Sequence, residues 1–151
     1  MQQLKILNKK EIKIILEIIK RQWDADFKED YCFLMNDKNK IFIVNKDIAK
    51  IDFSRIRINN LGLYFGELKN NSLRLSIEGS QIIGKDAKKN ILELNDIELE
   101  SWVKGEDINI DSKLKGFVII KNKNDFYGSG KIIENKLLNF VPKSRRLRVI
   151  N

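Results

Sequence analysis

Hydrophobic residues near the start of the chain recur at the three- and four-residue spacing of a helix. The apolar members of this stripe are Ile12, Ile15, Leu16, Ile19 and Trp23. Just before the stripe, Asn8 precedes Glu11 by three residues, which is the capping-box arrangement that opens a helix. We therefore predict a helix from about Lys9 to Gln22, with an apolar stripe broad enough to lie against a sheet.

Apolar, β-prone runs separated by polar turns follow this helix. Tyr31–Met35 and Ile41–Val44 flank a polar turn and predict a hairpin. The pattern further predicts a helical turn at 47–51 and strands at 55–58 and 63–68. A short helix is expected at 76–83, capped by Ser76 and stopped by Gly84.

The pattern starts again near residue 86, with a strand at 91–94 and a helix that Asp96 caps and Gly105 ends. Alternating positions at 108–110 come next, then a hairpin of 115–121 and 125–133 and strands at 137–141 and 147–150. One helix among mostly strands indicates a small mixed β-barrel. We therefore predict an α+β protein, with an N-terminal α/β domain over residues 1–85 and the barrel domain over residues 86–151.

The composition is that of a globular protein, with 42% hydrophobic and 33% charged residues among 151. The chain has no histidine, so a histidine-based catalytic triad and a His/Cys zinc site are both excluded. Its one cysteine, Cys32, lies in an apolar run and is expected to fill the core. The sequence shows no secretory signal and no apolar run long enough for a bilayer. We expect a cytoplasmic protein that needs no metal or cofactor and contacts no membrane.

The segment from Lys113 to Asn151 carries the whole net charge of +8. It holds ten lysines and arginines and two acids, whereas the first 112 residues hold nineteen of each sign and are neutral. Cations gathered on one part of a chain are typical of nucleic-acid binding, because they neutralise phosphates and release counterions. A basic end that serves only solubility is the alternative.

The stretch Gly128-Ser-Gly130-Lys131 superficially resembles a phosphate loop. A P-loop needs four residues between its glycines and a hydroxyl residue after the lysine, and this stretch has neither. The glycines instead indicate a bulge or the close approach of another backbone. If that backbone is RNA, Lys131 is placed to meet a phosphate.

A basic cluster follows Pro142, which fixes the backbone before it. Its members Lys143, Arg145, Arg146 and Arg148 are suited to phosphate contacts. Phe126, Tyr127 and Phe140 alternate with the charges of this region. They would stack on unpaired bases if exposed, or fill the core at strand spacing.

Residues 61–148 resemble the C-terminal, PUA-like RNA-binding extension of the RNA 5-methylcytosine methyltransferase family. The progression Gly-x-Gly-Lys, Asn-x-x-Pro and Lys-x-x-Arg carries much of the resemblance. The matching stretches are 62–66, 94–106, 116–120, 128–131, Asn139 and 142–146. The two-part layout also resembles a family of small ribosome-biogenesis factors that end in a PUA domain.

The resemblance implies a PUA domain that binds structured RNA, in the setting of RNA modification or ribosome biogenesis. It places the RNA near the glycine-ended helix, at Lys104 and Gly105. The family's catalytic features are not carried over, because the chain has no glycine-rich strand-to-helix fingerprint and Cys32 does not follow a proline. Methyl transfer is therefore not expected.

The sequence thus favours a non-catalytic protein that binds rRNA or tRNA and works beside a separate RNA-modifying enzyme or a ribosomal particle. The alternatives are a protein-interaction adaptor in ribosome assembly and an RNA-acting enzyme that uses carboxylates or lysine. The candidate RNA-contacting residues are Lys104, Gly105, Tyr127, Gly128, Gly130, Lys131, Asn139, Lys143, Arg145, Arg146 and Arg148.

Overall fold

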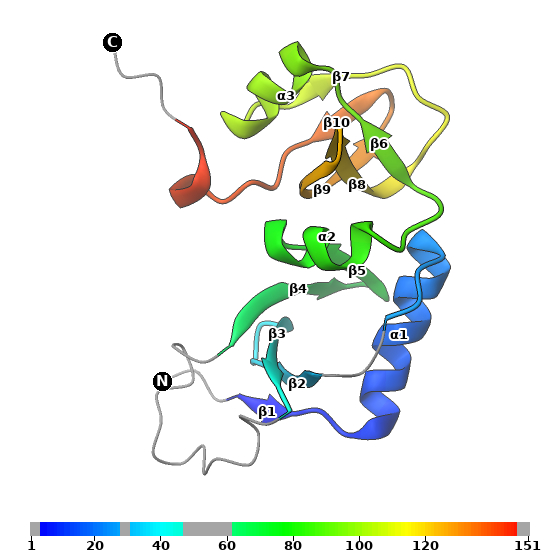
Figure 1. Ribbon diagram of the computed structural model, residues 1–151, viewed down its shortest axis with the longest axis vertical. Coiled ribbons are helices and arrows are strands. Elements are labelled where there is room, and N and C mark those ends of the chain that lie inside the picture. The colour runs from blue at the N-terminus through cyan, green and yellow to red at the C-terminus, as the bar shows by residue number, and fades with distance from the viewer. Residues whose placement is uncertain (1–3, 28–30, 47–61, 148–151) are drawn as a thin grey trace.

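The computed structural model describes residues 4–27, 31–46 and 62–147. Within these ranges it shows two five-stranded sheets stacked along the long axis of the molecule, with a short helix, α2, between them (Figure 1). This arrangement confirms the predicted α+β class. No helix in the described ranges is both long and apolar enough to cross a membrane.

The N-terminal sheet is antiparallel throughout, and its strands follow one another in chain order. The predicted hairpin of 31–45 forms its centre, and β1 and β5 are edge strands that the pattern did not predict. The strands are β1 Lys5–Ile6, β2 Tyr31–Met35, β3 Lys40–Asn45, β4 Leu63–Lys69 and β5 Ser72–Leu75.

Helix α1, Lys9–Trp23, opens with the predicted capping box. The Asn8 side chain accepts a hydrogen bond from the Glu11 N–H (2.9 Å), and the Glu11 carboxylate accepts one from the Asn8 N–H (3.1 Å). The helix ends where Asp24 takes a left-handed conformation. Its buried stripe, which contacts the sheet, consists of Ile15, Ile18, Ile19 and Trp23.

Helix α2, Ile77–Gly84, is capped by Ser76, whose hydroxyl oxygen accepts a hydrogen bond from the Gly79 N–H (2.9 Å). It contacts β4 and β5 of the N-terminal sheet and β8 and β9 of the second sheet. The ring of Phe126 lies so close to Gly84 that a Cβ at this position would stand 2.5 Å from a ring carbon. Gly84 is the last helical residue, and Lys85 is the C-cap.

The C-terminal sheet is mixed, in the order β6-β8-β9-β10-β7. Strand β6 runs parallel to β8, and the other pairs are antiparallel. The sheet curls, with helix α3, Asp96–Val103, at one end (Figure 1). Its strands are β6 Ile91–Glu93, β7 Ile108–Asn109, β8 Gly116–Asn122, β9 Asp125–Ile133 and β10 Lys136–Leu138.

Three predicted boundaries in this half were wrong. Asn95, not Asp96, caps α3, because the Asn95 side chain and the Glu98 carboxylate form a second capping box. The strand predicted to reach Val141 ends at Leu138, and Leu147 follows a short 3-10 turn at Lys143–Arg145 instead of beginning a strand. The elements predicted at 47–51 and 55–58, and residues 148–150 of the last strand, lie outside the described residues.

The core of the N-terminal sheet extends across α2 into the second sheet. It includes Ile119 from β8 and Phe126 from β9, together with Ile83 of α2. A second core surrounds the buried Trp102 of α3, inside the curl of the C-terminal sheet. The two sheets therefore share buried side chains where α2 joins them.

Candidate nucleic-acid interface

A cleft of about 270 Å³ opens where the two sheets meet beside the first turn of α2. The N-terminal sheet contributes residues of β3, β4 and β5, and the C-terminal sheet contributes β9 and the segment that follows β10. The cleft is polar and aromatic at once. The side chains that give it this character are Lys40, Tyr64, Arg74, Glu78, Phe140 and Arg145.

Cations lie over the aromatic rings that line the cleft. The Arg74 guanidinium carbon stands 4.5 Å from the centre of the Phe140 ring, and the Lys40 Nζ stands 5.8 Å from the centre of the Tyr64 ring. Both distances are within the range at which a ring face attracts a cation. Arg74 lies on β5 and Phe140 follows β10, so this contact joins the two sheets.

The pattern of rings and cations continues beyond the cleft onto the C-terminal sheet. The rings of Phe140 and Phe117 are 6.2 Å apart between centres, and the Lys131 Nζ lies 5.4 Å from the centre of the Phe117 ring. We call Lys40, Tyr64, Arg74, Phe140, Phe117 and Lys131 the cation–aromatic strip. All six side chains are half-buried, so each still presents part of its surface to solvent.

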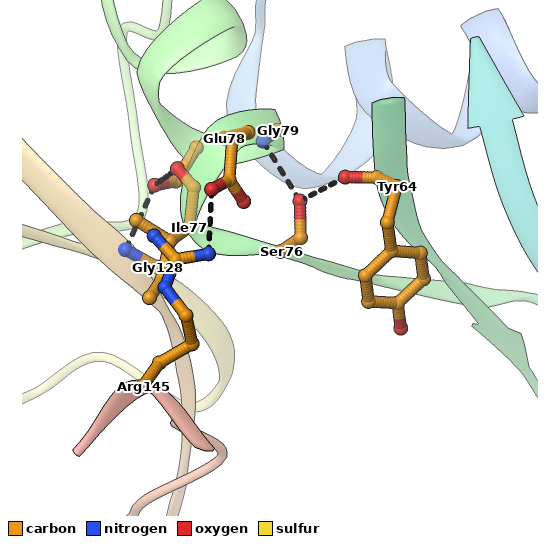
Figure 2. Close-up of polar contacts among 8 residues, drawn as sticks. Tyr64, Ser76, Ile77, Glu78, Gly79, Gly128 and Arg145 are labelled. Atoms are coloured by element: carbon orange, nitrogen blue, oxygen red, sulfur yellow. Dashed lines mark hydrogen bonds and ion pairs between the residues drawn. The ribbon is translucent and has the colours of Figure 1, made fainter. Parts of the chain in front are cut away.

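Two ion pairs hold the arginines of the cleft. The Arg74 Nη2 lies 2.5 Å from a Glu67 carboxylate oxygen, and the Arg145 Nη1 lies 2.6 Å from a Glu78 carboxylate oxygen. Figure 2 shows Arg145 reaching from the 3-10 turn to Glu78 on the first turn of α2. The Arg145–Glu78 pair therefore ties the C-terminal segment to the helix between the sheets.

The Tyr64 backbone carbonyl accepts a hydrogen bond from the Ser76 hydroxyl (2.6 Å), which fixes β4 against the start of α2 (Figure 2). Burial raises the pKa of the Tyr64 phenol above its ordinary value, while the nearby positive charge of Arg74 opposes the rise. The phenol therefore stays protonated at neutral pH and keeps its hydrogen-bond donor.

The glycine stretch of β9 lies inside the molecule. The Gly128 N–H donates to the Ser80 hydroxyl (2.8 Å), and the Ser129 hydroxyl donates to the Leu75 carbonyl (2.9 Å). A Cβ on Gly130 would stand within 2.8 Å of Leu137 and Trp102 side-chain atoms. The close approach at Gly130 is therefore made by the protein core, whereas Gly128 is buried against α2 and its backbone lines the wall of the cleft.

Asn139 also makes its contacts within the protein. Its side-chain amide donates to the carbonyls of Trp102 (2.8 Å) and Glu106 (3.0 Å), and its carbonyl oxygen accepts from the Val141 N–H (2.8 Å). These bonds attach the segment after β10 to the end of α3. Asn139 thus positions Phe140 at the cleft.

The structure brings Arg146 onto the glycine that ends α3. Gly105 has a φ of +89°, and a Cβ there would collide with the Arg146 side chain. The Arg146 Nε donates to the Val141 carbonyl (3.0 Å). Lys104, which precedes Gly105 in the chain, pairs with Glu100 (3.1 Å). Lys104, Gly105 and Arg146 therefore form one group at the C-terminal end of α3.

The remaining predicted residues differ in exposure. Lys143 is exposed on the 3-10 turn, and Lys131 is half-exposed over Phe117. Tyr127 is half-buried against the second core, and its carbonyl accepts the hydrogen bond of the Trp102 indole (2.8 Å). Arg148 lies outside the described residues.

Sequence reasoning missed the half of the cleft that comes from the N-terminal sheet. Lys40, Tyr64 and Arg74 lie on three different strands, and only the folded sheet brings them to Phe140. The available signal was the alternation along β4, where Phe65 is fully buried and the neighbouring Tyr64 is not. A large aromatic on the open face of a strand indicates a contact surface.

Two family models match the chain, one on each side of α2. Residues 89–147, which contain β6 to β10 and α3, match the Methyltransferase RsmF PUA domain. These residues form a PUA-like domain, which we call the PUA domain. The PUA domain thus supplies Phe117, Lys131, Phe140 and Arg145, and the resemblance seen in the sequence is confirmed.

Residues 4–77 match the NIP7/UPF0113 pre-PUA domain, which supplies Lys40, Tyr64 and Arg74. The chain is also 21% identical over 136 residues to the ribosomal RNA small subunit methyltransferase F of Vibrio vulnificus, in strains YJ016 and CMCP6. The similarity covers 90% of this chain and 28% of the length of those relatives. The cleft therefore lies where a pre-PUA domain meets a PUA domain.

Proposed function

We propose that this protein binds structured RNA, rRNA or tRNA, and acts without catalysis of its own in rRNA modification or ribosome biogenesis. The observation that carries the proposal is the PUA domain together with the charge it bears. The excess of cations over acids lies entirely between Lys113 and Asn151. Most of this segment falls within the residues that match the PUA domain. Phosphates are the complement of such a surface.

The proposed phosphate contacts are the accessible cations of the PUA domain. Lys143 and Lys131 are first, because Lys143 is exposed and Lys131 is held at the end of the cation–aromatic strip. Arg145 joins them at the cleft, and Lys104 and Arg146 form a second group beside Gly105. Contacts of this kind fix the position of the RNA and leave selectivity to its shape.

The proposed absence of catalysis rests on the nature of the matches. Both matched models describe PUA-related domains, and the chain spans little more than a quarter of the methyltransferases it resembles. The protein would then present RNA to a separate modifying enzyme or to a ribosomal particle. Its one cysteine is free, which suits a reducing compartment such as the cytoplasm.

The test is a fluorescence-anisotropy titration of tRNA, an rRNA stem-loop and duplex DNA over a series of salt concentrations. The wild type should prefer RNA, and its affinity should fall steeply with salt. The double variant Lys131→Ala/Lys143→Ala should bind with a slope of log affinity against log salt that is shallower by about 2, or about one unit per lost phosphate contact.

The matched control is Lys10→Ala/Lys13→Ala, which removes the same charge from exposed positions on α1. This control should keep the wild-type slope. Weak binding that is equal for RNA and DNA and the same in both double variants would contradict the proposed function.

A further inference from the structure

We propose that the cleft between the two domains binds a single unpaired base of the RNA, stacked on Tyr64 and Phe140, with its phosphate held by Lys40 and Arg145. This inference rests on the proposed function and specifies what part of the RNA the protein recognises. The PUA cations would contact paired or unpaired RNA alike, whereas the cleft would accept only a base that has left its helix.

Tyr64 and Phe140 keep accessible surface at the cleft, unlike the aromatic side chains at the centres of the two cores. Phe33, Phe65, Trp23 and Trp102 are fully buried, while Tyr64 and Phe140 keep accessible surface in the cleft. Leaving a large ring partly exposed forgoes hydrophobic stabilisation, so two such rings in one concave site indicate a ligand with an apolar face. Nucleic-acid bases have that face, and proteins recognise unpaired bases by stacking them on aromatic rings and arginine planes.

Arg74 is fixed in a position that favours stacking. Its ion pair with Glu67 and its place over the Phe140 ring hold the guanidinium at the wall of the cleft. Because Arg74 and Phe140 are already stacked on each other in the free protein, their side chains lose little additional conformational freedom when a base enters. Arg74 and Phe140 also come from different domains, so the base would contact both.

The size of the cleft limits what it accepts. Its volume of about 270 Å³ is below the ~300–1,000 Å³ typical of sites that enclose drug-sized ligands. A single base fits this limit better than an extended ligand. The strip continues through Phe117 to Lys131, which offers a path for the adjoining nucleotide over the PUA domain.

The charge of the cleft matches one phosphodiester. Three cations, Lys40, Arg74 and Arg145, face two acids, since Glu67 pairs with Arg74 and Glu78 pairs with Arg145. One positive charge therefore remains uncompensated in this group, which is the complement of the single negative charge of a nucleotide in a chain. A neutral or cationic ligand would leave that charge without a partner.

The test compares a short blunt RNA duplex with the same duplex carrying one bulged 2-aminopurine, a fluorescent base whose emission falls when it stacks. The wild type should bind the bulged duplex roughly tenfold more tightly than the blunt one, because stacking one base on aromatic side chains strengthens binding by about that factor. Binding should also quench the 2-aminopurine emission.

Phe140→Leu and Tyr64→Leu remove one ring each while keeping an apolar side chain. Each should lose most of the preference for the bulge and most of the quenching, with the affinity for the blunt duplex unchanged. The matched control is Phe42→Leu, whose half-buried ring lies 5.6 Å from that of Tyr64 but does not line the cleft. It should behave as the wild type in both readouts, and a thermal melt by circular dichroism establishes that each variant is folded.

Two failures are distinguishable. If the wild type binds both duplexes equally, with a steep salt dependence and no quenching, the cleft proposal is overturned and RNA binding by the PUA domain stands. If neither duplex binds and the tRNA and the rRNA stem-loop bind no better than duplex DNA, the proposed function itself is overturned. A bulge preference that persists in both folded leucine variants would place the base elsewhere and would likewise overturn the cleft proposal.

Discussion

At the scale of single residues, the two sides of the cleft have different origins in the sequence. Phe140 was recognisable as a base-stacking candidate because it lies in the basic segment, and its half-exposed ring does line the cleft. Gly128 and Gly130 of β9 lie in the same basic segment and indicated the close approach of another backbone, but in the fold they are buried against α2 and Trp102. A glycine that admits a close neighbour does not identify the neighbour, and this is why sequence alone could not separate the two cases.

Glu78 is the residue whose removal should strengthen RNA binding. It places a negative charge in the cleft and occupies Arg145, so Glu78→Gln frees a cation and removes a repulsion. We expect the affinity for RNA at low salt to rise about fivefold, as expected for roughly 1 kcal/mol of charge interaction. The free energy of unfolding should change by less than about 1 kcal/mol, because the pair is partly exposed.

The measurement for Glu78→Gln is the same anisotropy titration, with chemical denaturation for stability. Glu93→Gln, an exposed acid on β6, is the matched control for the change in net charge. An equal gain in both variants would show that net charge, and not the position of Glu78, controls the affinity.

At the scale of secondary-structure elements, local signals predicted most of the fold. The bounds of β9 were predicted correctly, and α1 differs from its prediction by one residue, because strand alternation and a capping box act over a few neighbouring residues. The short edge strands β1 and β5 escaped prediction, since two to four residues hold too little periodicity. The cap of α3 was misplaced by one residue because Asn95 and Asp96 are both good caps, and only the Asn95–Glu98 geometry distinguishes them.

The capping box of α1 should contribute to the dependence of stability on pH. Hydrogen bonds from Lys5 and then from the Asn8 N–H lower the pKa of Glu11 below its ordinary value of 4.5. Because the pKa is lower in the folded state, the contribution is complete above the unfolded value and is lost as the pH falls through the folded one. We expect Glu11→Gln, measured by chemical denaturation between about pH 6 and pH 3, to lose less stability on acidification than the wild type.

Glutamine keeps the hydrogen bond of the capping box, so the comparison isolates the charge of Glu11. Glu17→Gln, at an exposed position on the same helix, is the control and should follow the wild-type profile. If the free energy of unfolding of Glu11→Gln falls in parallel with that of the wild type down to pH 3, the charge of Glu11 and its pair with Lys5 do not contribute to the pH dependence of stability.

At the scale of the whole molecule, α2 and the shared core make the two domains one structural unit. The division that we propose between residues 85 and 86 does not separate two independent cores, since Ile119 and Phe126 of the PUA domain lie in the core of the pre-PUA domain. The cleft depends on this junction, because its two walls belong to different domains. No local pattern could have predicted it, as Arg145 and Glu78 are 67 residues apart.

The two domains should therefore unfold together. The chain has two tryptophans, and each is fully buried, Trp23 in the core of the pre-PUA domain and Trp102 in that of the PUA domain. Trp102→Phe leaves a fluorescence reporter of the first domain, and Trp23→Phe leaves one of the second. Within each variant, we expect the fluorescence and far-ultraviolet circular dichroism transitions in denaturant to coincide, as a two-state transition requires.

Each variant serves as its own reference, so the stability lost by either substitution does not affect the comparison. A tryptophan signal that changes before or after the circular dichroism signal, in either variant, would show that the domains unfold separately.

The shared core also bears on how the protein is made. Ribosomes synthesise chains from the N-terminus, and the sheet that ends at Leu75 needs Ile119 and Phe126 to complete its core. Until the β8–β9 hairpin has emerged, the apolar side chains that will pack beneath it have no cover. Nascent or truncated chains that stop before Phe126 should therefore aggregate or engage chaperones, whereas the full chain folds as its last strands arrive.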